Sequence, residues 1–367
     1  MKKTLASLLA SVLLPVFGIG QQFSSRVVDT NSISSSIGYA RDSQGTNHMF
    51  YSANNRLYYQ KGEAKQQVSF PMSSQQLYSD LKFSRDSPVA VVTSYLNTPT
   101  TNNWRIMQVY QENRTWKSRE IFSPSSNRCA QLVDGNHQTF LATDDASDDL
   151  YLLSASNFTN FPPQISKQRL SRVKSQKNPQ IARDKNHRLY ALWEESDDKT
   201  LKSCTGRITN KGLEDVSELG EFSFDGNISV GSDNSVNVVY KNSKVRPTSC
   251  KQVADVVTKR LGSGVEEIIK KDVETPVGKP ISSITDSKGM HHVQWTESCS
   301  NGLKLVYCNS DDYSKQTVVD EGGAEGLGET KLEVVGDTVS SVANFHSLVY
   351  YEGEIKRKEK GTVFIVR

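Results

Sequence analysis

The sequence predicts an all-β protein, a seven-bladed β-propeller of four-stranded antiparallel blades. One pattern recurs seven times: an extended apolar segment, an aspartate at a turn, and a second strand that ends in a large aromatic residue, as in "PISSITDSKGMHHVQW" and "PQIARDKNHRLYALW". The turn aspartates are Asp42, Asp86, Asp134, Asp184, Asp233, Asp286 and Asp337. By subtraction, they lie 44, 48, 50, 49, 53 and 51 residues apart. A period near this length, built from short strands, is typical of propeller blades.

Two further strands follow the aromatic residue in most copies. Third strands such as "NRLYYQK" come after a polar loop, and fourth strands such as "KQQVSFP" and "GVEEIIKK" come after them. Alternation of period two dominates, as at Val236, Val238 and Tyr240, and sustained helical spacing is missing. We therefore expect four strands per blade and a single domain over residues 21–367, because each blade buries its faces only against its neighbours.

The ring is expected to close through the two chain ends. The segment "SSRVVDT" at residues 24–30 resembles the outer strand "KQTVVDE" of the sixth copy and precedes the first inner strand. We expect it to join the last blade as its outer strand, beside "GTVFIVR" at residues 361–367. Such pairing removes edges that would otherwise promote aggregation.

The first 20 residues read as a secretory signal peptide. Lys2 and Lys3 precede an apolar run from Leu5 to Phe17, and small residues follow before Gln21. An uncleaved membrane anchor is the alternative, but Pro15 and two serines interrupt the run, which is short for a bilayer span. No later segment is apolar enough to span a membrane, so we expect a secreted, extracellular protein.

Secretion would permit disulfides and glycosylation. Five cysteines remain after the cut, an odd number that leaves at least one thiol free or paired between molecules. Their spacings resemble no zinc module, and their pairing stays open. Possible N-glycosylation sites are Asn113, Asn157 and Asn227.

Charge excludes one class of partner. Removing residues 1–20 takes away two lysines and no acids, so the formal charge falls from +3 to +1. A protein that binds nucleic acid needs clustered, excess Lys and Arg to displace the counterions of the phosphates, so we expect no nucleic-acid partner. The sequence also indicates no cofactor.

The histidines and aspartates lose their catalytic interest once the repeat is recognised. His48, His137 and His292 occupy one column in the first, third and sixth copies, which are too far apart around the ring to share a metal. The seven equivalent aspartates are expected to be structural, because Asp accepts hydrogen bonds from turn amides two residues on. We predict no metal site and no catalytic residues.

Arginines and two tryptophans are the candidate binding residues. Arg41, Arg85 and Arg183 each precede a turn aspartate, so they could converge at one mouth of the central channel and bind a carboxylate or sulfate. The alternative is that each pairs with a turn aspartate. Trp104 and Trp116 lie outside the aromatic column, which we expect to pack between blades, and are candidates for exposed stacking on sugars.

The repeat resembles that of secreted proteins in the sialidase-like (BNR-repeat-like) propeller superfamily, over essentially the whole mature chain. Sialidases of that superfamily carry six blades, Asp boxes of the form S-x-D-x-G-x-x-W and an Arg-Ile-Pro element. This chain has seven copies and no intact Asp box, and its first inner strand reads "SIGYARD". The resemblance therefore implies a non-catalytic member.

Three functions remain open. The first is an extracellular, lectin-like module that binds glycans. The second is an extracellular scaffold that binds proteins, and the third is a sialidase-like glycoside hydrolase or lyase. All three rest on the fold. The loops between second and third strands, such as "NTPTTNN" and "TESCSNG", do not repeat a constellation of side chains, which weakens the first reading.

Overall fold

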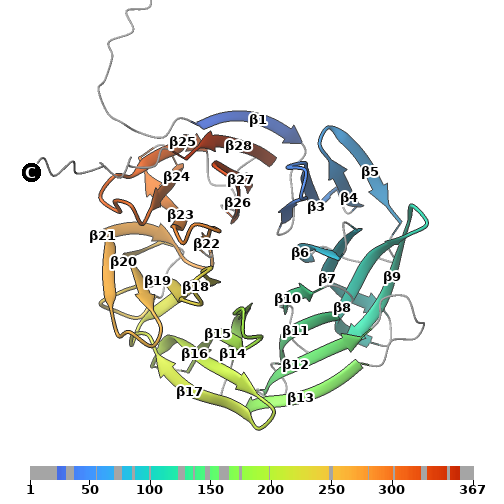
Figure 1. The fold of residues 1–367 in the computed structure, drawn as a ribbon, viewed down its shortest axis with the longest axis horizontal. Coiled ribbons are helices and arrows are strands. Elements are labelled where there is room, and N and C mark those ends of the chain that lie inside the picture. The colour runs from blue at the N-terminus through green and yellow to red at the C-terminus, as the bar shows by residue number, and fades with distance from the viewer. Residues whose placement is uncertain are drawn as a thin grey trace, which may run out of the picture.

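The computed structural model describes residues 23–29, 37–54, 56–69, 77–84, 87–98, 101–122, 129–134, 137–144, 149–156, 165–172, 176–197, 199–247, 251–279, 281–300, 302–323, 329–344 and 348–355. Within these ranges the chain forms 28 strands and no helix. Figure 1 shows the strands as seven blades around a central axis, with β6, β10, β22 and β26 nearest to the centre. The predicted fold is confirmed.

Each blade is a four-stranded antiparallel sheet, and blades are numbered here in chain order. Blade 1 holds β2 (Gly38–Arg41), β3 (Asn47–Ala53), β4 (Arg56–Lys61) and β5 (Ala64–Val68). Blade 2 holds β6 (Leu77–Ser84), β7 (Ser87–Thr98), β8 (Thr101–Glu112) and β9 (Thr115–Phe122). Blade 3 holds β10 (Cys129–Asp134), β11 (His137–Asp144), β12 (Asp149–Ser156) and β13 (Ile165–Arg172). Blade 4 holds β14 (Gln176–Arg183), β15 (Leu189–Ser196), β16 (Leu201–Thr209) and β17 (Gly212–Glu218).

The remaining blades follow the same order, and the last one uses both ends of the chain. Blade 5 holds β18 (Ser223–Val230), β19 (Val236–Asn242), β20 (Lys251–Arg260) and β21 (Glu266–Pro276). Blade 6 holds β22 (Ser282–Thr285), β23 (His291–Cys299), β24 (Gly302–Asn309) and β25 (Thr317–Gly323). Blade 7 holds β26 (Glu329–Val335), β27 (Thr338–Asn344), β28 (Leu348–Glu354) and, outermost, β1 (Phe23–Asp29).

Ring closure by β1 is confirmed, with one correction. The strand pairs antiparallel with β28, from Phe23 opposite Gly353 to Asp29 opposite Leu348. Its partner is therefore residues 348–354, and the expected partner, residues 361–367, lies outside the described residues. Together with β26 and β27, these two strands give the last blade its four strands.

Large aromatic side chains fill the interfaces between blades, as predicted. Tyr51, Trp193, Tyr240 and Trp295 are each at most 1% exposed. In one interface, Trp295 of blade 6 packs in a cluster with Val239 and Val256 of blade 5. Burying an aromatic side chain of this size stabilises the fold by roughly 1.5–3 kcal/mol, so the column accounts for much of the core.

The part of the chain that the structure describes holds no helix that is long and apolar enough to cross a bilayer.

Candidate functional site

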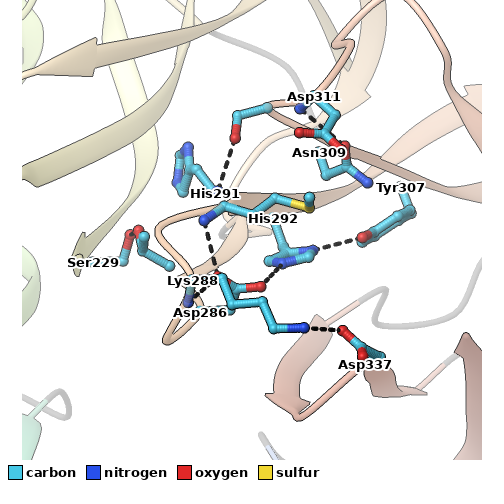
Figure 2. Close-up of polar contacts among 12 residues, drawn as sticks. Ser229, Asp286, Lys288, His291, His292, Tyr307, Asn309, Asp311 and Asp337 are labelled. Carbon is cyan, nitrogen blue, oxygen red and sulfur yellow. Dashed lines mark hydrogen bonds and ion pairs between the residues drawn. The ribbon is translucent and has the colours of Figure 1, made fainter. Parts of the chain in front are cut away.

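The turn of blade 6 shows what the repeated aspartate does (Figure 2). Asp286 Oδ1 accepts hydrogen bonds from the backbone amides of Lys288 and Met290, both at 2.9 Å. Its Oδ2 lies 3.3 Å from His292 Nε2, and His292 Nδ1 lies 2.6 Å from the hydroxyl of Tyr307. The carboxylate thus closes its own turn and orients a buried histidine.

Blade 1 repeats this arrangement. Asp42 Oδ1 accepts the amides of Gln44 and Thr46 at 3.0 and 2.7 Å, and its Oδ2 lies 3.0 Å from His48 Nε2. His48 Nδ1 lies 2.5 Å from the hydroxyl of Tyr59. Gly45 supplies the left-handed φ of 78° that this turn needs. The same Asp-His-Tyr row occurs in both blades, with six residues from Asp to His in each, and it has a structural role in both.

The electrostatics of blade 1 agree with that role. Burial lowers the pKa of His48 although Asp42 opposes the shift, so the imidazole is neutral at pH 7. Burial raises the pKa of Asp42, but the hydrogen bonds from His48 and the turn amides lower it further, and the net shift is downward. Both ring nitrogens of this neutral imidazole have partners, Asp42 on Nε2 and the hydroxyl of Tyr59 on Nδ1, which is the arrangement of a structural histidine.

Other turn aspartates also accept hydrogen bonds, either within their own blade or from a neighbouring blade. Asp184 accepts the amides of Asn186 and Arg188, both at 2.9 Å. Asp233 accepts the amide of Ser235 at 2.9 Å, and Asp337 accepts Nζ of Lys288 from blade 6 at 2.8 Å. Asp86 and the side chains of Asp134 and His137 lie outside the described residues. Nowhere in the described ranges do three His, Cys, Asp or Glu side chains gather as metal ligands would.

The three arginines differ in their surroundings. Arg41 donates from Nε and Nη2 to the carbonyl of Gly45 at 3.0 and 2.8 Å, and its Nη2 lies 3.7 Å from Glu352 Oε2 of blade 7. Its partners are thus a turn carbonyl and a neighbouring glutamate rather than a turn aspartate. Arg183 ends β14 in blade 4, and blades 2 and 3 lie between it and Arg41. Arg85 lies outside the described residues, so a channel-mouth triad stays a prediction.

A cluster of charged side chains near Arg41 was not anticipated from the sequence. Glu333, Gly38 and Lys82 each lie four residues before the turn aspartate of blades 7, 1 and 2. The inner strands of blades 1 and 2 approach closely here, since a Cβ on Gly38 would lie 3.0 Å from Cβ of Leu81. Asp80 lies on the same strand as Lys82. With no side chain on Gly38, the side chains of the two flanking blades can act on each other.

The pKa shifts record this proximity. Burial raises the pKa of Glu333, Lys82 opposes that shift, and Asp80 adds to it. Asp80 raises the pKa of Lys82, burial opposes the shift, and Glu333 adds to it. Lys331 and Arg41 also act on Glu333. The inner strands of blades 7, 1 and 2 therefore bring three cationic and two acidic groups together. Aligning the fourth residue before each turn aspartate would have found two of them, Glu333 and Lys82.

The expectation that Trp116 is exposed is wrong. Its side chain is 7% exposed and packs against Phe50 and Tyr59 of blade 1, with ring centroids 5.4 and 4.7 Å away. Its Nε1 donates to Gln66 Oε1 at 3.3 Å. The indole fills the interface between blades 1 and 2. The side chain of Trp104 lies outside the described residues.

The cysteines and sequons are only partly described. Cys204, Cys299 and Cys308 are free thiols, so no disulfide joins any of these three. Asn113 is exposed at the hairpin between β8 and β9, with a positive φ of 51°. Asn227 is half-buried on β18 and accepts a hydrogen bond from Ser283 at 3.0 Å. Cys129, Cys250 and Asn157 have no described side chain.

Comparison with known proteins finds similarity in fold alone. The sequence matches no family model and no curated protein. Among solved structures, it aligns with a polysaccharide lyase, an ulvan lyase described as bound to -[GlcA(1-4)Rha3S]-, at a TM-score of 0.59 and 7% identity, covering 90% of this chain and 95% of that one. Hydrazine synthase of Kuenenia stuttgartiensis aligns at 0.53 and 9% identity, covering 87% and 95%.

Two other structures align less well. A Hadza microbial sialidase gives a TM-score of 0.49 at 13% identity, covering 82% of this chain and 73% of that one. TolB from Acinetobacter baumannii gives 0.45 at 13% identity, covering 78% of this chain, which spans only 64% of TolB. The lyase and hydrazine synthase alignments, at 7% and 9% identity, show a similar fold alone and no shared function.

Proposed function

We propose that this chain is an extracellular carbohydrate-binding propeller that recognises acidic glycans at the end of the ring where Arg41 lies. The observation that carries the proposal is the charged cluster of blades 7, 1 and 2. Arg41, Lys82 and Lys331 lie near Asp80, Glu333 and Glu352, and the raised pKa of Glu333 favours its neutral form, which leaves an excess of positive charge. A site with this balance favours an anionic ligand.

The chemistry of the cluster suits a carboxylate or sulfate on a sugar. Guanidinium and ammonium groups form charge-assisted hydrogen bonds with such oxyanions, each contributing roughly 1.5–3 kcal/mol. The saccharide described for the ulvan lyase contains GlcA, which makes glucuronate the first ligand to test.

Calorimetric titration of glucuronate oligosaccharides, sialic acid and a sulfated disaccharide tests the proposal. The wild type should bind at least one of them, with affinity that falls as salt rises. Lys82→Ala should weaken binding about tenfold, equivalent to about 1.4 kcal/mol. Replacing Arg41, Arg85 and Arg183 together with alanine tests the wider triad.

Lys244→Ala is the matched control, because Lys244 is exposed in blade 5 and pairs with Asp272. It should leave binding unchanged. If the wild type binds none of the sugars, or Lys82→Ala binds them as well as the wild type does, the acidic-glycan proposal is wrong. The protein-binding scaffold would then become the leading function.

A further inference from the structure

Blade 2 departs from the repeat where it meets blade 3. Counting from the hairpin that joins the third and fourth strands, Tyr110 corresponds to Tyr59 of blade 1, and both are buried. By the same count, Gln108 and Arg119 occupy the positions of Leu57 and Val68 in blade 1, two buried apolar residues that face each other across the sheet. A glutamine and an arginine thus replace a leucine and a valine.

Blade 3 departs at the position that faces this pair. Gln138 comes two residues before the large aromatic Phe140. The corresponding residues of blades 1, 4, 5 and 6 are all buried and apolar: Met49, Ala191, Val238 and Val293. Two neighbouring blades therefore place polar groups on the same interface, where blade 1 has Leu57 and Val68 and blades 1, 4, 5 and 6 have an apolar residue opposite them.

The polar groups form a chain across the interface. Arg119 Nε donates to Gln108 Oε1, and Gln108 Nε2 donates to Gln138 Oε1 of blade 3. The guanidinium carbon of Arg119 lies 5.3 Å from the ring centroid of Tyr110. Both glutamines are 0% exposed and Arg119 is 8% exposed. This row of polar groups supplies an acceptor for Nε of Arg119 but no negative charge.

The charge of Arg119 is not neutralised by any residue that the structure describes. In the described part of the chain, no carboxylate forms an ion pair with Arg119, and its Nη1 is sealed from solvent without a hydrogen-bond partner. Burial lowers the pKa of the guanidinium. By contrast, the fully buried Lys241 of blade 5 lies 3.0 Å from Asp225 Oδ2 and donates to two backbone carbonyls. A buried cation without a counter-ion is strongly unfavourable.

We propose that the interface between blades 2 and 3 binds an oxyanion, a carboxylate or a sulfate, on the Nη1 and Nη2 edge of Arg119. Gln108 already occupies Nε, which leaves this edge to form two parallel hydrogen bonds with the oxygens of the anion. Gln108 and Tyr110 hold the guanidinium plane in place. The site lies on the third and fourth strands of blade 2, away from the inner strands that carry Arg41 and Lys82, and does not depend on the proposed function.

Thermal unfolding at constant ionic strength tests the site. Sodium sulfate and sodium acetate are exchanged for sodium chloride in the millimolar range, and glucuronate and a sulfated disaccharide are tested in parallel. The wild-type Tm should rise and then saturate, because an anion that binds only the folded state stabilises it by mass action. In Arg119→Met, the saturable rise should be lost.

Arg105→Met is the matched control, since Arg105 lies in the same blade but pairs with Glu120 at 2.7 Å. It should keep the full saturable rise. A rise with free sulfate or acetate indicates a free oxyanion as ligand, and a rise with the sugars alone indicates an acidic sugar. The proposal is wrong if neither group raises the wild-type Tm, or if Arg119→Met responds as the wild type does.

Arg119→Met changes the packing of the interface as well as its charge. A second variant, Arg119→Lys, retains the charge but presents no planar edge. It should bind sulfate more weakly than the wild type, by about tenfold or more, while remaining folded. Equal sulfate affinity in Arg119→Lys and the wild type would overturn the bidentate geometry. The failure of sugar binding in Lys82→Ala would not affect either result, so the two sites are tested separately.

Discussion

The two interfaces that flank blade 2 are built from equivalent positions but differ in chemistry. Toward blade 1, the contact is an apolar cluster that includes Phe50, Leu57 and Trp116. Toward blade 3, an apolar cluster around Phe140 is joined by the polar chain from Arg119 to Gln138. The first interface follows the repeat and stabilises the ring. The second departs from the repeat and buries a guanidinium that no carboxylate of the described residues neutralises.

The largest effect is expected on the apolar side. Trp116→Ala should lower the free energy of unfolding by about 3–5 kcal/mol, because it removes a buried indole and leaves a cavity between blades 1 and 2. Chemical denaturation measures the loss. Val216→Ala, at an exposed position in blade 4, should change stability by less than about 0.5 kcal/mol. A loss under 1 kcal/mol for Trp116→Ala would mean that the indole is not part of the core.

Imposing the chemistry of the first interface on the second should stabilise the protein. The double variant Gln108→Leu, Arg119→Met restores the apolar pattern of blade 1 and removes a buried charge. Its free energy of unfolding should rise by about 1–4 kcal/mol in the absence of oxyanions. The same denaturation experiment measures it, with Arg105→Met as control. A loss of stability would show that the polar chain is favourable as it stands, and the contrast between the interfaces would fail.

Acid should act on the first interface more than on the second. His48 faces blade 2, with its ring centroid 4.7 Å from that of Phe83, whereas the cation of the second interface is an arginine that does not titrate. The pKa values of His48 and Asp42 are both lowered in the folded protein, so the unfolded chain binds more protons in acid. Stability should therefore fall as pH drops below about 6.5, the ordinary pKa of histidine.

The His48→Gln variant isolates this effect. It should reduce the slope of unfolding free energy against pH by less than about 1.4 kcal/mol per pH unit, the limit for one proton. Equilibrium unfolding at a series of pH values gives the slope. An unchanged slope in His48→Gln would assign the acid sensitivity elsewhere.

The smallest effect is expected in the charged cluster on the inner strands of blades 7, 1 and 2. The pKa of Glu333 is raised in the folded protein, so its stabilising contribution is present below the ordinary pKa and is lost as pH rises through the folded value. Glu333→Gln should thus be more stable than the wild type at pH 7, by less than about 1 kcal/mol because the side chain is half-buried and partly screened. Thermal unfolding at pH 4 and pH 7 measures the difference, which should shrink at the lower pH. A larger gain at pH 4 would reverse the sign of the argument.

The repeat made the fold predictable, and the same repeat hid most of the candidate sites. Seven aspartates, alternation of period two and matched chain ends predicted blade number, strand number and ring closure, because each is a local property of the sequence. The identity of the last strand beside β1 was missed, since two apolar segments near the C-terminus compete for that position. Trp116 was misplaced because a tryptophan outside the column looks like a surface residue until its interface is seen.

The charged groups were harder still to foresee. Arg119, Gln108 and Gln138 lie on two blades, and only the packing of one blade on the next brings them into contact. Lys82 and Glu333 are separated in sequence by most of the ring. Their importance comes from the absence of a side chain at Gly38, a residue that ordinarily indicates a turn. Sequence reasoning found the arginine beside them and missed the cluster.

Ring closure by β1 also sets how the molecule responds to mechanical load. Phe23, at the start of β1, lies opposite Gly353, near the end of β28, so both chain ends leave the sheet on the same side. A force that pulls the ends apart therefore loads the hydrogen bonds of this pair one at a time, from Phe23 toward Asp29, instead of shearing them all together. The blade closure should open like a zipper at low force, while the other six blades, each formed by one continuous segment of chain, keep their strands.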